Sequence, residues 1–219
     1  MHIEADEFRA ALGIRLLLPP IPAPGNLGCR CQNPRVRFAD APMHPLLCPC
    51  NQLFRNYRHT LVRDQLFELI KRLDPQADVV KERALEGPPG GAQRRSDVWY
   101  RKGGKVFVID VSVVEPCAVA CLAKGADMIE MVASALQEKT KQQHYHGCPI
   151  LAPGGGAVLI PFVVESTGRL GVAARDLYDL ITKEQKLFGS LFLDRMSGAL
   201  ARGTGRLVCS ARRSLRMFT

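Results

Sequence analysis

Val106-Phe107-Val108-Ile109-Asp110-Val111-Ser112-Val113-Val114 is the stretch that decides the fold, because it has the composition of a buried strand interrupted by one carboxylate. Thirteen positions earlier, Asp97 in Arg94-Arg95-Ser96-Asp97-Val98 begins a second apolar segment. An unpaired buried charge costs several kcal/mol, so such carboxylates are usually paired, hydrogen-bonded or bound to metal. On neighbouring strands of one hairpin, the two aspartates could hold one divalent cation.

Two simpler interpretations are open for the same residues. Asp97 could cap a turn after the Gly-Pro-Pro-Gly-Gly loop, and Asp110 could pair with one of the thirty lysines and arginines. The rest of the chain has to decide between these interpretations and a cation site.

Composition limits the classes of protein that need to be considered. A chain of 219 residues can bury a sizeable core, and its net charge of +9 favours an anionic partner such as nucleic acid. No stretch approaches the roughly 18 apolar residues of a membrane span, and the acidic start is unlike a signal peptide. We therefore expect no membrane partner and a nuclear or cytoplasmic location.

Periodicity and turn residues predict the elements. Helices are expected over 8–18, 59–73, 117–142, 175–188 and 191–200, with strands at 78–82, 97–101, 105–114 and 157–165. Lys102-Gly103-Gly104 predicts a hairpin between the two middle strands. This order indicates an α/β (α+β) fold, a mixed sheet flanked by helices, with a small N-terminal zinc-binding segment.

The domain organisation follows from composition. Residues 1–28, with the Pro-rich run 19–25, are expected to be a linker segment, and 29–59 a zinc-knuckle-like segment. Residues 60–201 form the main domain, and the arginine-rich residues 202–219 are expected to be a loose basic tail.

Four of the eight cysteines lie between positions 29 and 50, in the pattern Cys29-x-Cys31 followed by His44-x-x-x-Cys48. Zinc takes four tetrahedral nitrogen or sulfur ligands, usually from two close pairs separated by a loop. We expect structural zinc on these four residues, with Cys50 and His59 as substitutes in the second pair. Zinc would fold a segment that has little apolar material of its own.

The motifs together resemble a known family. Cys-x-Cys, His-x-x-x-Cys, Arg58-His59, Arg95-Ser96-Asp97-Val98, Ile109-Asp110-Val111-Ser112 and Lys141-x-x-x-Tyr145 resemble the C-terminal region of non-LTR retrotransposon polyproteins. There, a zinc knuckle precedes a restriction-like endonuclease of the PD-(D/E)XK class. The resemblance covers roughly residues 29–170.

The resemblance implies a catalytic group. Asp97 and Asp110 would bind Mg²⁺ with the carbonyl of Val111, and Glu82 would be a further acid acting through a bridging water. The lysine usual two residues after the second acid is replaced by Ser112. Lys141, with Tyr145, would take its place from the following helix, and Lys139 is the competing candidate.

Basic residues around these motifs are candidate phosphate contacts. They are Arg94, Arg95, Arg101, Lys102 and Lys105 around the hairpin, and Arg55, Arg58 and Arg63 beside the zinc segment.

The sequence thus predicts a metal-dependent DNA endonuclease domain that nicks target DNA for a reverse transcriptase of the same polyprotein, with the RNA template as a further possible partner. A catalytically inactive nucleic-acid-binding module derived from such an enzyme is the alternative. A zinc-stabilised protein-interaction domain is a third reading, and it would leave both strand aspartates unexplained.

Overall fold

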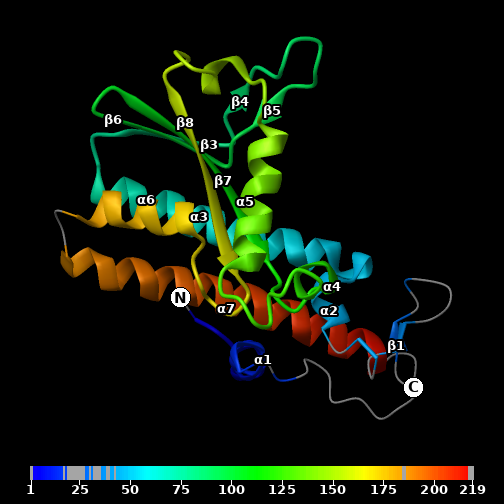
Figure 1. Cartoon of the computed structure of the whole chain (residues 1–219). Helices are drawn as coiled ribbons and strands as arrows, with labels where there is room; N and C mark the ends of the chain where they lie inside the picture. The colour runs from blue at the N-terminus through cyan, green and yellow to red at the C-terminus, as the bar shows by residue number, and fades with distance from the viewer. Residues whose placement is uncertain are drawn as a thin grey trace.

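A computed structural model describes residues 2–16, 18, 28–29, 31, 36–37, 40–41, 43–183 and 186–216. The expected linker at 19–25 lies outside these residues. Figure 1 shows helices on both sides of a central sheet, with the longest helix running along the lower edge. The architecture is a mixed α/β sheet flanked by helices, as the sequence predicted at that level.

The central sheet has four strands in the order β3 (Asp78–Lys81), β6 (Val98–Lys102), β7 (Lys105–Val114) and β8 (Ala157–Glu165). The pairs β3–β6 and β6–β7 are antiparallel, and β7–β8 is parallel. Gly103 and Gly104 both have positive φ in the turn of the β6–β7 hairpin, a conformation that glycine adopts without steric cost. The predicted hairpin is therefore confirmed.

Two pairs of very short strands lie outside this sheet. β1 (Gly28–Cys29) pairs with β2 (Val36–Arg37), and β4 (Ala84–Leu85) pairs with β5 (Arg94–Arg95). The second pair ends just before Asp97.

The helices are α1 (Ala5–Arg15), α2 (His44–Leu47), α3 (Gln52–Leu73), α4 (Val119–Leu122), α5 (Val132–His144), α6 (Val172–Thr182) and α7 (Lys186–Arg216). Single 3₁₀ turns, η1 (Pro49–Asn51) and η2 (Pro149–Leu151), precede α3 and β8. None of the helices among the described residues is long and apolar enough to cross a bilayer.

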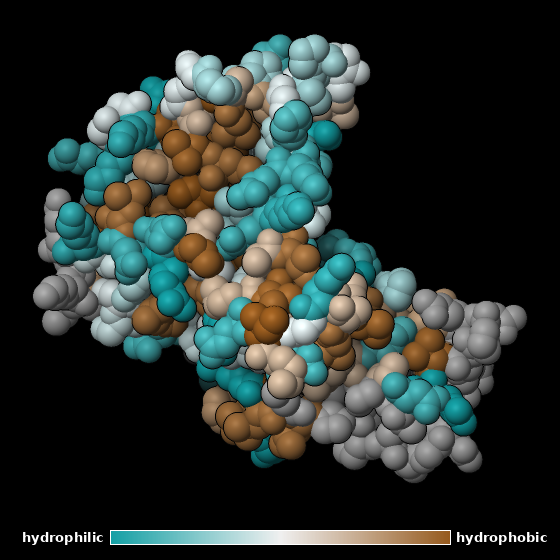
Figure 2. Space-filling model, viewed as in Figure 1, coloured by the Kyte–Doolittle hydropathy of each residue, from teal (hydrophilic) through white to brown (hydrophobic). Residues whose placement is uncertain are grey.

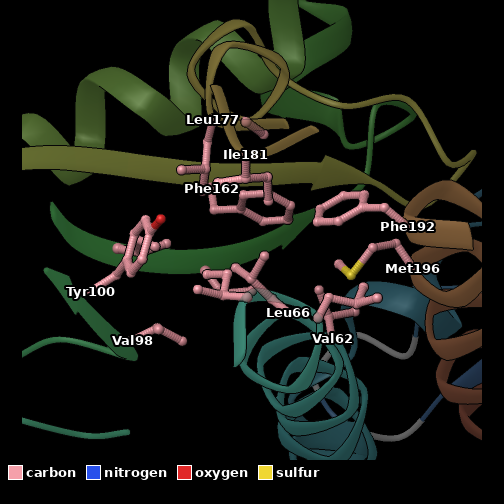
Figure 3. Packing of buried hydrophobic residues seen from close by; sticks show 14 of the residues in the cluster. Val62, Leu66, Val98, Tyr100, Phe162, Leu177, Ile181, Phe192 and Met196 are labelled. Carbon is pink, nitrogen blue, oxygen red and sulfur yellow. The ribbon is translucent and has the colours of Figure 1, made fainter. Parts of the chain in front are cut away.

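The main core lies between one face of the sheet and helices α3, α6 and α7 (Figure 3). Alternation along the strands decides which side chains enter it. Tyr100 of β6, Ile109 of β7 and Phe162 of β8 point to this face, where Leu66 of α3 and Phe192 of α7 meet them. The hydrophobic periods of α3, α6 and the first half of α7 are thereby explained.

The opposite face of the sheet carries a smaller apolar cluster and the polar residues of the candidate site. Trp99 and Val108 pack there with Tyr145 and Cys148, which follow α5. Asp110 and Ser112 follow Val108 at every second residue of β7, so their side chains lie on the same face of the sheet as Val108. The strand register therefore points Asp110 toward α5.

One helix prediction was wrong. Residues 117–142 were expected to form one helix, but the chain leaves the helical conformation between α4 and α5, where Gly125 and Met131 have positive φ. Ile129, expected in the apolar stripe, is 60% exposed. The apolar spacing continued through a segment whose backbone turns.

The expectation of a loose tail from residue 202 was also wrong. Helix α7 continues to Arg216, and its second half packs against α1 and α2 in a cluster made by Ala10, Ile14, Leu46, Leu207 and Val208. The remaining helices were predicted with shifted ends. Helix 8–18 is Ala5–Arg15, 59–73 begins at Gln52, 175–188 is Val172–Thr182, and 191–200 falls within α7.

Candidate functional site

The β6–β7 hairpin brings the two predicted aspartates together. Asp97 precedes β6, and its backbone N–H donates to the Ile109 carbonyl at 3.1 Å, next to Asp110 on β7. The Val111 N–H donates to Asp97 Oδ2 at 2.7 Å. The Asp97 and Asp110 carboxyl groups are close enough that each influences the pKa of the other. Two acids 13 residues apart therefore form one cluster at the end of the hairpin opposite its turn.

Lys141 reaches this cluster from α5. Its Nζ donates to Asp110 Oδ1 at 3.0 Å, and the Asp110 side chain is only 8% exposed. Burial and the Asp97 charge raise the pKa of Asp110 to about 6, and Lys141 opposes part of that rise. The structure thus places a lysine beside the second acid although position 112 is serine.

His59 of α3 completes the group from the other side. Its Nε2 lies 3.1 Å from Asp97 Oδ2 and 3.1 Å from the Val111 carbonyl oxygen. Burial lowers the pKa of His59, but the hydrogen bond and charge of Asp97 outweigh burial, and the pKa is raised. Burial likewise raises the pKa of Asp97, and the His59 contact outweighs it, so the pKa of Asp97 is lowered. Protonated His59 and ionised Asp97 therefore stabilise each other.

The other predicted catalytic residues have different surroundings. Tyr145 is buried, its hydroxyl donates to the Arg95 carbonyl at 2.6 Å, and burial and Asp110 raise its pKa. The Glu82 carboxylate binds Arg63 and lies 3.7 Å from Arg95, while its backbone N–H donates to the Asp97 carbonyl at 3.0 Å. Lys139 is exposed.

The predicted phosphate contacts are not gathered in one place. The register pairs Lys102 with Lys105 at the turn of the hairpin, so these two and Arg101 lie at the end opposite the acids. Arg94 donates to the His144 carbonyl at 3.1 Å, close to the end of α5. Arg58, expected on the surface, is only 4% exposed.

A pocket of about 370 Å³ adjoins the acid cluster. It is lined from α2, α3, α5, the end of β7 and the residues between β7 and α4, and it includes His59, Val111 and Lys141 of the cluster. In Figure 2 the outline of the molecule is hollowed on the right, between the part with β4 and β5 and the part with α2 (Figure 1). The elements around this hollow carry the candidate site.

A second group of ligand-bearing side chains lies in the N-terminal segment. The ligand atoms of Cys29, Cys31, His44 and Cys48 all lie within 4.8 Å of one another. Cys29 Sγ is 3.3 Å from Cys48 Sγ, and Cys31 Sγ is 3.1 Å from His44 Nε2. These four residues could hold one metal ion, and three sulfurs with one imidazole nitrogen are a donor set typical of structural zinc.

The surroundings shift the pKa of the four groups in different directions, and burial raises the pKa of the Cys31 and Cys48 thiols. Burial lowers the pKa of His44, which favours the neutral form that binds metals. Burial opposes ionisation of Cys29, but hydrogen bonds from Cys48 and the Cys31 backbone outweigh burial and lower its pKa.

The two substitutes considered for this group are not among the four, although Cys50 lies beside them and affects the pKa of Cys29 and Cys31. Cys50 is exposed and outside the group of four, and His59 belongs to the acid cluster. The placement of His59 beside Asp97 was therefore missed by sequence reasoning, although Arg58-His59 had been noted as a motif.

No protein-family model matches this chain, and no curated protein matches it.

Proposed function

We propose that this chain is a metal-dependent DNA endonuclease with a restriction-like fold and a structural zinc site. The observation that carries the proposal is the convergence of Asp97, just before β6, Asp110 of β7 and Lys141 of α5 on one buried cluster. Two adjacent carboxylates, one of them with a pKa raised by burial and in contact with a lysine, are typical of functional sites.

Mg²⁺ fits this donor set, because it prefers carboxylate and carbonyl oxygens and retains several waters. Asp97, Asp110 and the Val111 carbonyl would hold it. When bound, the ion would polarise a phosphodiester and lower the pKa of a bound water.

The protein's own groups have separate parts in this proposal. Lys141 offers its ammonium to an oxygen of the scissile phosphate, where charge develops during hydrolysis. His59 holds the Asp97 carboxylate in place through Nε2, and the Val111 N–H does so from the strand. Tyr145 is tied to the Arg95 carbonyl, which fixes it beside Asp110.

The test is nicking of supercoiled plasmid by the purified chain in Mg²⁺. Asp97→Asn, Asp110→Asn and Lys141→Ala should each lower the nicking rate by on the order of a hundredfold or more. Lys139→Ala is the matched control, because it removes an exposed lysine from the same helix, and it should retain the wild-type rate. Equal rates for all four variants would exclude the assignment.

One observation favours the alternative of a non-catalytic nucleic-acid-binding module. His59 Nε2 already satisfies Asp97 Oδ2 and the Val111 carbonyl, two of the oxygens assigned to the cation. Lys141 and His59 together compensate the charge of the acids without metal. This alternative predicts DNA binding that weakens steeply with salt and no cleavage with any divalent cation.

A further inference from the structure

The pocket beside the acid cluster contains buried polar groups that the proposed hydrolysis does not use. Arg58 and Glu115 line it, and they are 4% and 3% exposed. By atomic geometry Arg58 Nε and Nη1 and Glu115 Oε2 have no hydrogen-bond partner, although the Ser166 side chain lies close enough to Glu115 to oppose the rise in its pKa that burial causes. Among the described residues no ion pair within 4.0 Å joins these two side chains. Unsatisfied buried groups of this kind each cost about 1–3 kcal/mol.

The rest of the pocket wall suits a flat, partly apolar ligand. Val113, Val114 and Ala118 supply apolar surface, and Asn56 and Gln137 add side-chain amides. The volume of about 370 Å³ is within the range of small-molecule sites and is much larger than a single phosphate group requires.

The combination of donor and acceptor decides between a phosphate and a base. The oxygens of a phosphodiester only accept hydrogen bonds, so a phosphate would satisfy Arg58 and would offer no donor to Glu115 Oε2. A nucleobase edge carries acceptors and N–H donors side by side, and arginine and carboxylate side chains are standard partners for them. A base therefore satisfies both groups, whereas a phosphate satisfies one.

We propose that this pocket accepts one unstacked nucleobase of the nucleic-acid substrate, read by Arg58 and Glu115. The inference rests on the proposed function, since His59, Val111 and Lys141 are shared by the pocket and the acid cluster. A nucleotide whose phosphate lies at the acids has its base next to this pocket. Extruding a base costs a few kcal/mol, least at mismatched or single-stranded positions.

The three unpaired atoms are buried in the free protein, so the proposal requires the side chains of Arg58 and Glu115 to turn toward the pocket when the base enters. Satisfying three unpaired atoms offsets part of the cost of unstacking. This pocket gives base preference at one position, which phosphate contacts alone do not provide.

The experiment is methyl NMR of the full chain without divalent cation, so that no turnover is needed. The probes are dAMP, dCMP, dGMP, dTMP and deoxyribose 5-phosphate. The methyl signals of Val113 and Val114 should shift and saturate with at least one nucleotide and stay unchanged with the sugar phosphate. Equal shifts with the sugar phosphate, or no shift with any nucleotide, would overturn the proposal.

A matched pair of variants tests the residue assignment. Glu115→Gln should weaken binding of the preferred nucleotide by on the order of tenfold. Glu86→Gln, at an exposed position outside the pocket, should leave that binding unchanged. If Glu115→Gln does not fold, the comparison of nucleotides with the sugar phosphate on the wild type still tests whether the pocket binds a base.

Nick mapping separates this inference from the proposed function. Sequenced nick positions should show a base preference at one fixed distance from the cut. Nucleotide-dependent shifts without any nicking would contradict the proposed nuclease activity and support the base pocket. Nicking without base preference and without methyl shifts would contradict the base pocket and support the nuclease activity.

Discussion

Asp110 is the residue at which burial and charge oppose each other most strongly. It lies in a strand whose neighbours are apolar, beside a second carboxylate, with Lys141 as its cationic partner. Its ionised form is therefore held less favourably in the folded protein than in water.

This gives a prediction about stability and pH. Folding raises the pKa of Asp110 from 3.8 to about 6, so the native state binds a proton more tightly than the unfolded chain. Between these values stability falls as pH rises, and the total loss, complete above about pH 6, is on the order of 3 kcal/mol. Asp110→Asn should therefore be more stable than wild type in urea at pH 8 without divalent cations, and the difference should vanish near pH 4.

Asp97→Asn is the matched control, because the pKa shift of Asp97 has the opposite sign. The lowered pKa of Asp97 contributes stability that is present at neutral pH and is lost as pH falls. Asp97→Asn should destabilise the protein at pH 8, where His59 would lose its carboxylate partner. Stabilisation by both substitutions would show that burial, and not the His59 contact, dominates at both sites.

Cation binding is a separate prediction at the same residues. If Asp97 and Asp110 hold a divalent cation, Mg²⁺ or Mn²⁺ should raise the melting temperature of the wild type with a saturable concentration dependence. Asp110→Asn should abolish that rise, and Lys139→Ala should preserve it. Identical curves for wild type and Asp110→Asn would favour the charge-compensated, non-catalytic alternative.

The sequence predicted this cluster only in part. The aspartates were visible because a carboxylate interrupts an apolar strand, and Lys141 was proposed through the resemblance. His59 was not placed there, since it lies 38 residues from Asp97 and no local pattern relates a residue on α3 to the hairpin. Its position follows from how α3 packs on the sheet, which is a long-range property.

At the scale of elements, strands were predicted better than helix continuity. The hairpin was marked by alternation and two glycines, whereas the interruption between α4 and α5 depends on the backbone of Gly125 and Met131 within an unbroken apolar period. The second half of α7, which contains Gly203 and Gly205, was missed because its arginines suggested a tail. Contacts with α1 stabilise it there.

Those glycines permit a close approach of helices. A Cβ on Gly205 of α7 would lie 2.1 Å from the carbonyl oxygen of Glu7 in α1, and one on Gly203 would lie 2.7 Å from Arg58 Cγ. Gly205→Ala should therefore destabilise the protein by about 1–3 kcal/mol despite the better helix propensity of alanine.

Gly13→Ala is the matched control for this prediction. Gly13 lies inside α1, and a Cβ there would meet only Leu18 Cβ, at 4.0 Å. Alanine should stabilise the protein by about 0.5–1 kcal/mol at this position. Opposite signs for the two substitutions in urea unfolding would identify the α1–α7 contact, and equal stabilisation would contradict it.

At the scale of the whole molecule, the metal-binding segment and the long helix are one structural unit. Leu46, two residues before Cys48, is fully buried against Leu207 and Val208 of α7 and Ile14 of α1. A metal ion on the four Cys and His side chains therefore fixes the backbone that carries this anchor.

Removal of the metal should consequently weaken the α1–α7 contact as well as the segment itself. We expect one zinc per chain by elemental analysis, loss of that zinc in Cys29→Ser and His44→Ala, and a melting temperature lower by more than about 4 °C in both. Hydrogen exchange should accelerate in α1 and in the part of α7 around Leu207, while β7, in the main core, keeps its protection.

Cys50→Ser separates the metal from general effects of losing a thiol. Cys50 is exposed, lies two residues from Cys48 and is outside the group of four, so its substitution should leave zinc content and melting temperature unchanged. Zinc loss in Cys50→Ser with retention in His44→Ala would mean that Cys50 is the fourth ligand. Full zinc loss without any change in α7 exchange would mean that the long helix is held by its apolar contacts alone.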